Sequence, residues 1–533
     1  MEYGLRQFET TSSGRRVIMA LAFIGYFILW LTPRMAPIEA NVLMADDFTQ
    51  DPRTHLLSYR PLLYADLWFW NLIMGNGYLM TMFPKLLAGI YLSLAAMVTF
   101  ELLQRWGISL LVSLIIPVFY LSHPIVNELS LWNTIASCNL SMLLILIGYQ
   151  VMGDSFSLQR TVYAIFLIAL GVSGYQIYAG LLVVLIIGEP IIKKINNIHF
   201  SAREVVRKTM IIFIALAIYV LYIKISQNVF GLYDFGNRSF VSPVSSTMAD
   251  FVDTKWHGMS NMFANVFQSL ISFYFGAKAS FHAWKWVPIG MGCLTLIISL
   301  LAKRSWHDTA FFALTPVLLP ALATSILLPI NATPSGWRVC GPVLFAFSLS
   351  MVPTLSLIMK SDAIPTIRST IHKRIFGKTA VVTGIAVFWL AITIPVITYH
   401  SSLRVIANKK ELETLRSMDT FWKERGLVRG GYMVAVYPAD NASRRKTFVS
   451  EEGRDIVINF NRVVSYDYSN LVKGFWPQFL MHYGYRPLTE SAGEDEMGCI
   501  LKDACEKQTD TNHVKSYLNV AHLDWLKLSV ICR

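Results

Sequence analysis

The chain has 533 residues, of which 54% are hydrophobic and 15% are charged, and its mean hydropathy is +0.47. Because soluble domains are about a quarter charged, this composition excludes an ordinary soluble protein. The formal net charge of +12 does not indicate a nucleic acid partner, because the basic residues cluster between the apolar runs, as membrane topology predicts.

Apolar runs near twenty residues predict an α-helical polytopic membrane protein, because about 20 helical residues cross a hydrocarbon core of roughly 30 Å. The first run has no convincing small-residue cleavage site, so we expect it to remain as an anchor. The run over 161–192 is long for one span and short for two, and small residues in its middle favour a turn. Counting it as two, the sequence predicts about 11 transmembrane helices, near residues 17–33, 85–103, 108–122, 135–152, 161–174, 176–192, 209–227, 287–302, 309–329, 340–359 and 379–398.

The distribution of basic residues favours this count. The short loops around Glu128 and Tyr175 contain no Lys or Arg. The opposite side collects Arg15, Arg16, Lys193, Lys194, Arg203, Arg207, Lys208, Lys303, Arg304, Lys360, Arg368, Lys373, Arg374 and Lys378. By the positive-inside rule the N-terminus is cytoplasmic, and the predicted outer segments are residues 34–84, 228–286, 330–339 and everything after about 399.

Two outer segments have the composition of helices that lie in the membrane interface. They are "YRPLLYADLWFWNLIM" (59–74) and "NMFANVFQSLISFYFGAK" (261–278). A short re-entrant helix or ordinary packing would fit these segments equally well.

The pattern of apolar and polar residues changes after residue 398. Apolar runs shorten to strand length in "YMVAVYP" and "DIVINF", with polar turns between them. This pattern predicts a transmembrane module over 1–398 and a soluble C-terminal domain of mixed α and β content over 399–533. In an oxidising compartment Cys499 and Cys505 could pair, and otherwise they are two free thiols.

Two adjacent acids, Asp46 and Asp47, follow the first predicted span. Such a pair can take a proton from a hydroxyl, hold a divalent cation such as Mg²⁺ or Mn²⁺, or bind a sugar by hydrogen bonds. Adjacent like charges also raise one of the two pKa values, which suits a base. A solvated acidic loop with no function is the alternative. Glu39, a few residues upstream, is a candidate for the same rim.

Three outer arginines, Arg53, Arg60 and Arg338, are candidates for binding a phosphate, because a guanidinium makes bidentate contacts to phosphate oxygens. Pro61 should hold Arg60 in an extended conformation. Contact with anionic lipid headgroups is the alternative for each arginine. Trp337, beside Arg338, could stack on a sugar ring, although Trp also collects at membrane interfaces.

Four further polar residues are predicted on the outer side, where they could line a cavity or only cap helices: His123, Glu128, Tyr175 and Gln176. Several other signals are absent from the sequence. There is no P-loop, no GxGxxG before a helix, no HExxH and no zinc-spaced CxxC pair, so no metal site or cofactor is predicted from a motif. Acids and bases are rare in the middle of the spans, which argues against ion-coupled transport.

The acidic pair in "MADDF", the Arg-Pro motif in "YRPLLYADLWF", the many spans and the outer tail resemble the polytopic glycosyltransferases of the GT-C class. The sequence is most similar to the bacterial serotype-converting O-antigen glucosyltransferases, the GtrII-like group often encoded by prophages. The resemblance covers roughly residues 15–400 and is carried by "APIEANVLMADDF" and "YRPL", with small additions from "SGYQIYAG" and "SGWRVCGP". The C-terminal domain resembles nothing we can place.

This resemblance implies transfer of glucose from undecaprenyl phosphate to a hydroxyl of lipid-linked O-antigen, at the periplasmic face of the inner membrane. It implies that Asp46 or Asp47 is the base and that Arg60 and Arg338 contact the donor phosphate. Metal dependence stays open. The undecaprenyl phosphate leaving group departs already ionised, so no strong general acid is required. A single in-line displacement would invert the configuration at the anomeric carbon. A lipid-linked oligosaccharide flippase, an O-antigen polymerase and a non-enzymatic assembly partner are the alternatives.

Overall fold

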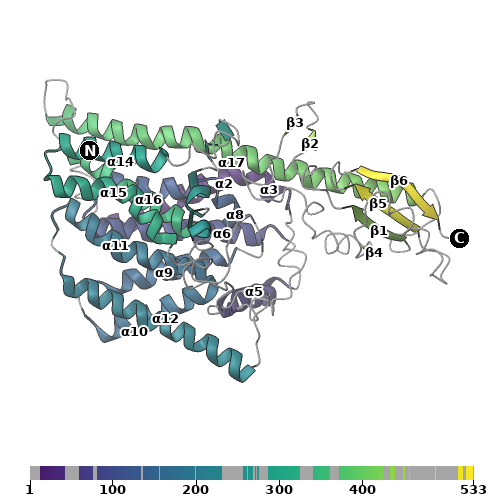
Figure 1. Cartoon of the computed structure of the whole chain (residues 1–533), viewed down its shortest axis with the longest axis horizontal. Helices are drawn as coiled ribbons and strands as arrows, with labels where there is room; N and C mark the ends of the chain where they lie inside the picture. The colour runs from purple at the N-terminus through teal and green to yellow at the C-terminus, as the bar shows by residue number, and fades with distance from the viewer. Residues whose placement is uncertain are drawn as a thin grey trace. The chain divides into compact units, whose positions relative to one another are not determined.

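The computed structural model describes residues 12–42, 59–75, 81–230, 256–274, 286–324, 340–360 and 371–423, with gaps at 132, 134–135, 155, 199, 261, 268–269 and 272, together with six strands further on. These residues form two compact units (Figure 1). Unit 1 contains Met1–Met35, Asp51–Leu131 and Ile135–Thr398, and unit 2 contains Ala36–Gln50, Trp132–Thr134 and Tyr399–Arg533.

Unit 1 is built from helices. Its first half contains α2 (Ser12–Leu31), η1 (Thr32–Arg34), α5 (Pro61–Met74), α6 (Phe83–Arg105), α7 (Leu110–Leu121), α8 (Val126–Ser130) and α9 (Cys138–Met152), and the short α3 (Met35–Glu39) continues from η1 into unit 2. Its second half contains α10 (Leu158–Gly174), η5 (Gln176–Tyr178), α11 (Ala179–Ile195), α12 (Ala202–Phe230), α14 (Trp286–Leu301), α15 (Trp306–Ala323), α16 (Gly341–Lys360) and the first part of α17 (Ile371–Lys423).

Each predicted span coincides with one of these helices, including the ambiguous run over 161–192. That run forms two helices, α10 and α11, which are separated at Tyr175 and η5. Among the described residues, six helical segments are long and apolar enough to cross a membrane, and four more apolar helices are shorter. The prediction of a mainly helical polytopic membrane protein is therefore confirmed. That eleven helices cross the membrane stays a prediction.

Neighbouring helices pack closely where one of them carries a glycine. Gly89 of α6 lies against the indole ring of Trp30, a buried residue of α2. Gly148 of α9 faces Ile168 of α10, and Gly171 of α10 faces Ile145 of α9. In Figure 1 the helices α9, α10 and α12 run side by side. Small residues permit this approach in a membrane, where helices associate through tight packing rather than through the hydrophobic effect.

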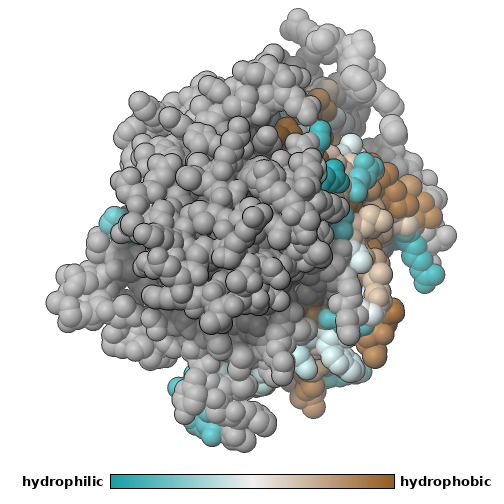
Figure 2. Space-filling view, turned by 90° about the vertical axis from the view of Figure 1, so that its right-hand side faces the viewer, coloured by the Kyte–Doolittle hydropathy of each residue, from teal (hydrophilic) through white to brown (hydrophobic). Residues whose placement is uncertain are grey.

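The outward faces of several helices are apolar. Exposed residues of α2, α10 and α12 include Leu21, Phe166 and Phe213, which are 64%, 61% and 63% exposed. Figure 2 shows brown hydrophobic residues on the described part of one face. A soluble protein would bury such residues, whereas hydrocarbon chains cover them at no cost.

The C-terminal end of α11 is capped by cationic side chains from two other parts of the chain. The carbonyl oxygen of Ile195 accepts from Arg304 Nη2 at 2.9 Å and from Lys360 Nζ at 3.0 Å. Arg304 Nη1 also donates to Asn197 Oδ1 at 3.3 Å. The last carbonyl groups of a helix have no partners within it, and cations also suit the negative end of the helix dipole. These contacts join the end of α11, the turn between α14 and α15, and the end of α16 on the predicted cytoplasmic side.

Unit 2 contains the described strands. They are β1 (Tyr432–Tyr437), β2 (Phe448–Val449), β3 (Asp455–Ile456), β4 (Arg486–Pro487), β5 (Val514–Asn519) and β6 (Asp524–Ile531). One sheet has the order β4-β1-β5-β6, in which β1 is parallel to β4 and β5 and β6 is antiparallel to β5. The predicted strand "YMVAVYP" contains β1, and only Asp455–Ile456 of "DIVINF" is a described strand. Cys499 and Cys505 lie outside the described residues.

The Gly89 contact gives a test of the packing between α2 and α6. A Cβ at Gly89 would overlap the Trp30 ring, whereas a Cβ at Gly25 on α2 would meet nothing within 4 Å. We expect Gly89→Ala to destabilise the protein by about 1–3 kcal/mol through overpacking and to lower its thermal midpoint in detergent. Gly25→Ala is the matched control and should leave the midpoint unchanged or raise it. Equal midpoints for the two variants would contradict this packing.

Candidate functional site

Arg60, Tyr175 and Gln176 are predicted from separate outer segments, and the structure brings them together. Arg60 precedes α5, and the other two residues lie between α10 and α11. Arg60 Nε donates to Gln176 Oε1 at 3.3 Å, and the guanidinium carbon lies 5.1 Å from the centroid of the Tyr175 ring. The ring stabilises the cation through its quadrupole. A half-buried guanidinium is thus held in one orientation.

The residue before Arg60 has an unusual backbone conformation. Tyr59 has φ +56°, in the left-handed region that non-glycine residues seldom adopt. Its carbonyl oxygen accepts from Tyr219 Oη at 2.9 Å and from Gln176 Nε2 at 3.5 Å, and its own hydroxyl accepts from Gln227 Nε2 at 3.0 Å. Gln176 Nε2 also donates to Tyr219 Oη at 2.7 Å. Helix α12 therefore holds the strained turn that aims Arg60.

A buried carboxylate fixes α5, the helix that begins directly after Arg60. Asp66 is 8% exposed, and Ser137 Oγ, just before α9, donates to its Oδ2. Its Oδ1 accepts from Tyr91 Oη of α6 at 3.1 Å and from Trp70 Nε1 at 3.2 Å. Burial raises the pKa of this carboxyl, and the three donors oppose the shift. Three side chains therefore satisfy the acid and tie α5 to the bundle.

Asp66 was missed in the sequence, although it lies inside the quoted segment "YRPLLYADLWF". The available signal was a lone acid in an otherwise apolar helix. Such a residue is costly to bury without partners, so its presence indicates donors on neighbouring elements. The opposite face of α5 is exposed and apolar, with Trp68 and Leu72 55% and 68% exposed. That amphipathic arrangement agrees with the predicted interfacial position.

His123 lies buried in the turn between α7 and α8. Its Nε2 lies 3.0 Å from the carbonyl oxygen of Val266, and its Nδ1 accepts from the Ile125 amide at 3.3 Å. This pattern assigns the proton to Nε2. Burial lowers the pKa of His123 to about 3, so the ring is neutral at physiological pH. The buried Arg34 donates to the His123 carbonyl oxygen at 3.5 Å. His123 thus links the turn between α7 and α8 to the segment that contains Val266.

The other predicted site residues belong to unit 2, have no described side chain or lie outside the described residues. Glu39 is the exposed last residue of α3 and belongs to unit 2. Glu128 lies in α8, and its side chain is not described. The remaining predicted residues lie outside the described part of the chain: Asp46, Asp47, Arg53, Trp337 and Arg338.

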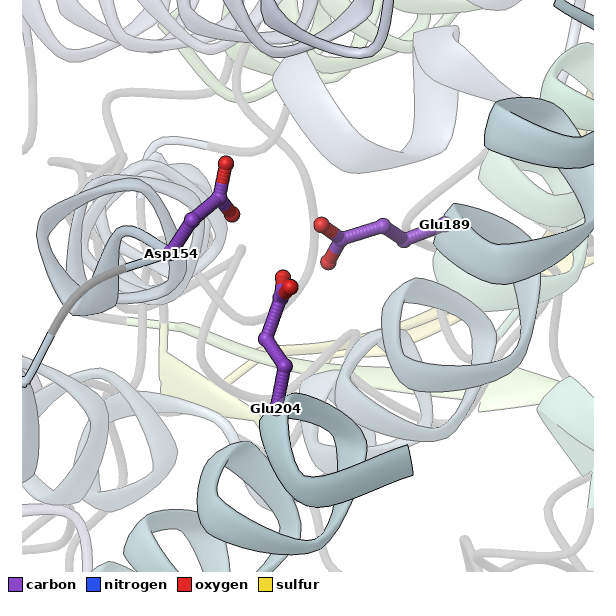
Figure 3. Close-up of side chains that lie close together, drawn as sticks. All are labelled: Asp154, Glu189 and Glu204. Carbon is purple, nitrogen blue, oxygen red and sulfur yellow. The ribbon is translucent and has the colours of Figure 1, made fainter. Parts of the chain in front are cut away.

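Three further carboxylates converge at the predicted cytoplasmic side (Figure 3). They belong to Asp154 after α9, Glu189 of α11 and Glu204 of α12, and their ligand oxygens lie within 4.8 Å of one another. Two buried ammonium groups form ion pairs with them. Lys208 Nζ lies 2.8 Å from Glu189 Oε1 and 2.9 Å from Glu204 Oε1, and Lys193 Nζ lies 2.7 Å from Glu189 Oε1.

Both lysines also contact Asp154, at 3.3 and 3.4 Å. Tyr149 donates to Glu189 Oε2 at 2.5 Å. A metal ion would have to displace these ammonium groups, so the described geometry favours an ion-pair network over a metal centre. Removing one member would leave an uncompensated buried charge, which is strongly destabilising. In the sequence, Lys193 and Lys208 indicated only which side of the membrane their loop faces.

The contacts of Asp66 lead to a prediction. Asp66→Ala should leave the polar groups of Ser137, Tyr91 and Trp70 buried without their acceptor, at about 1–3 kcal/mol for each unsatisfied group. The thermal midpoint and transferase activity should both fall. Asp66→Asn keeps an acceptor oxygen and should retain most of both properties. If the Ala and Asn variants behave alike, the carboxylate does not anchor α5.

Comparison with known proteins identifies the chain's family. No curated protein matches it. Residues 42–354 match the family described as Glucosyl transferase GtrII. That match covers most of unit 1, and it also covers the acidic pair in unit 2. It confirms the resemblance found in the sequence. With its long apolar helices, the chain is a membrane glycosyltransferase, and it belongs to the GtrII glucosyl transferase family.

Proposed function

We propose that this transferase moves glucose from undecaprenyl phosphate to a hydroxyl of a lipid-linked O-antigen repeat unit. The reaction would take place at the periplasmic face of the bacterial inner membrane. The family match supports glucosyl transfer. The observation that carries the donor assignment is the fixed guanidinium of Arg60, which directly precedes α5, a helix with an exposed apolar face. A lipid-linked phosphate requires a cation for its charge and an apolar surface for its hydrocarbon chain.

Arg60 has N–H groups that are available to donate hydrogen bonds to a phosphate. It uses Nε for Gln176, and within the described residues its two Nη groups donate to no protein acceptor. An Arg side chain carries five N–H donors in a planar fork that matches phosphate oxygens. The contact with Gln176 and the Tyr175 ring fixes this fork before a ligand arrives, so little conformational entropy is lost on binding.

The proposed chemistry is one displacement. The acceptor hydroxyl oxygen attacks the anomeric carbon while the bond from that carbon to the phosphate oxygen breaks. The hydroxyl proton passes to the carboxylate of Asp46 or Asp47, and the electron pair leaves with the phosphate. Arg60, with Arg338 and Arg53 as further candidates, stabilises the charge on the leaving group. Attack opposite the leaving group inverts the anomeric configuration.

In the proposed topology the N-terminus is cytoplasmic, about 11 helices cross the membrane, and residues 399–533 form a periplasmic domain. Glu39, Trp337 and the segments around His123 and Glu128 would lie toward the same outer side as the acidic pair. A divalent cation held by Asp46 and Asp47 is the alternative to direct proton transfer. Chelation by EDTA distinguishes the two, because only a metal-dependent reaction loses activity and regains it with Mg²⁺ or Mn²⁺.

A flippase or a polymerase remains the alternative function. A flippase requires cations inside a central cavity. The buried cations among the described residues are Arg34, Lys85, Lys193, Lys208 and Arg404, and two of them, Lys193 and Lys208, are paired with acids at one end of the bundle. A polymerase of O-units could also use outer arginines, but it would not need the early acidic pair.

The acidic pair is tested by single and double substitutions. Asp46→Asn and Asp47→Asn, made separately, should distinguish the base from its neighbour, and loss of the base should lower the transfer rate by about 10²–10⁴-fold. The measurement is the glucose content of the O-antigen by mass spectrometry. Wild-type glucosylation by the double variant would exclude this mechanism.

Arg60 is tested by Arg60→Gln. Loss of a charge-assisted contact of about 1.5–3 kcal/mol should reduce kcat/KM roughly ten- to hundredfold with purified donor and acceptor. Arg60→Lys keeps the charge but not the fork, so its loss should be smaller. Lys224→Gln removes a charge from the exposed side of α12 and is the matched control. An Arg60→Gln enzyme with the kinetics of this control would refute phosphate binding at this site.

A further inference from the structure

A cavity of about 250 Å³ lies between α2 and α6, at the end of these helices that carries Arg15 and Arg105. Its lining comprises Arg15, Ile18 and Met19 of α2 and Phe100, Glu101, Gln104 and Arg105 of α6. It lies on the predicted cytoplasmic side, opposite to the predicted transfer site. The side chains of Arg15 and Arg105 are 51% and 47% exposed, so a ligand can reach both guanidinium groups.

One carboxylate holds the two guanidinium groups together. Glu101 Oε1 accepts from Arg15 Nη2 at 2.6 Å and from Arg105 Nη2 at 3.1 Å. Gln150 Nε2 donates to Glu101 Oε2 at 2.5 Å, and the Gln150 carbonyl oxygen accepts from Arg105 Nη1 at 3.3 Å. Two positive charges share one negative charge, so the group keeps a net charge of +1. An anion near this group would be attracted.

The guanidinium groups also keep unused donors. Each has five N–H donors. Within the described residues, Arg15 donates only to Glu101, and Arg105 donates only to Glu101 and Gln150. The acid therefore orients the cations without consuming their hydrogen-bonding capacity. Such a preorganised pair suits a phosphate group, whose oxygens can accept from both arginines.

The surroundings of the cavity are apolar. Ile18, Met19 and Phe100 form part of its lining. An exposed apolar stripe continues along α2 from Ile18, which lines the cavity, to Leu21 and Ile28, which are 64% and 55% exposed. Their spacing of three and seven residues places them on one flank of the helix, next to the face that carries Arg15. A phosphate bound by the arginines would therefore lie beside a surface suited to hydrocarbon chains.

We propose that this cavity binds the headgroup of an anionic glycerophospholipid, with its phosphate at Arg15 and Arg105 and its acyl chains along the apolar stripe of α2. The site does not depend on the proposed transfer reaction. A zwitterionic lipid offers the same phosphate but brings its own cation close to the two guanidinium groups. The site therefore favours phosphatidylglycerol over phosphatidylcholine.

The test uses the purified full-length protein and native mass spectrometry during titration with phosphatidylglycerol or phosphatidylcholine. We expect one phosphatidylglycerol molecule to bind at least about tenfold more tightly than phosphatidylcholine, since each basic residue near an anionic lipid adds attraction. The doubly substituted Arg15→Gln, Arg105→Gln protein should lose this preference. The doubly substituted Arg16→Gln, Arg160→Gln protein removes two exposed arginines that do not line the cavity, and it should keep the preference.

Equal binding of the two lipids by the wild-type protein would overturn the proposal, and this comparison does not depend on the folding of any variant. An unchanged preference in the Arg15→Gln, Arg105→Gln protein would also overturn it. Inorganic phosphate is the third probe. If millimolar phosphate displaces phosphatidylglycerol completely, the cavity is a site for a soluble anion. Retention of the lipid under those conditions supports the lipid assignment.

Discussion

The buried carboxylate of Asp66 is the interaction on which the candidate site depends. It accepts from side chains of α5, of α6 and of the segment before α9. A short helix with one exposed apolar face would otherwise have little to fix its direction. Asp66 fixes the helix that follows the turn at Tyr59 and Arg60. Gln176 and Tyr219 bind the turn itself. The guanidinium is thus positioned by contacts distant from it in sequence.

The two ends of the bundle use charge in different ways. On the predicted cytoplasmic side, acids and lysines pair with one another across α11 and α12. Buried pairs of this kind add little net stability, since their desolvation offsets much of the Coulomb energy. On the predicted outer side, Arg60 is held by an amide and an aromatic ring and keeps its charge available for a ligand.

Much of the fold could be predicted from the sequence, because hydrophobic runs and loop charges report directly on the membrane environment. The glycines near residue 171 even indicated the division between α10 and α11. Arg60, Tyr175 and Gln176 were each singled out, but their contact could not be, since it joins segments 116 residues apart. Asp66 was missed for a related reason. Its donors Ser137 and Tyr91 lie 71 and 25 residues away, and neither carries a local signal.

The closed end of α11 has a consequence for how the chain assembles during synthesis. The Ile195 carbonyl oxygen receives its last partner from Lys360, which is 165 residues later in the chain. Until that lysine has left the ribosome, the helix end must rely on water or on Arg304. In the proposed topology this end lies at the membrane surface, where water is accessible. The late arrival of α16 therefore completes a contact that α11 and the turn before α15 leave open.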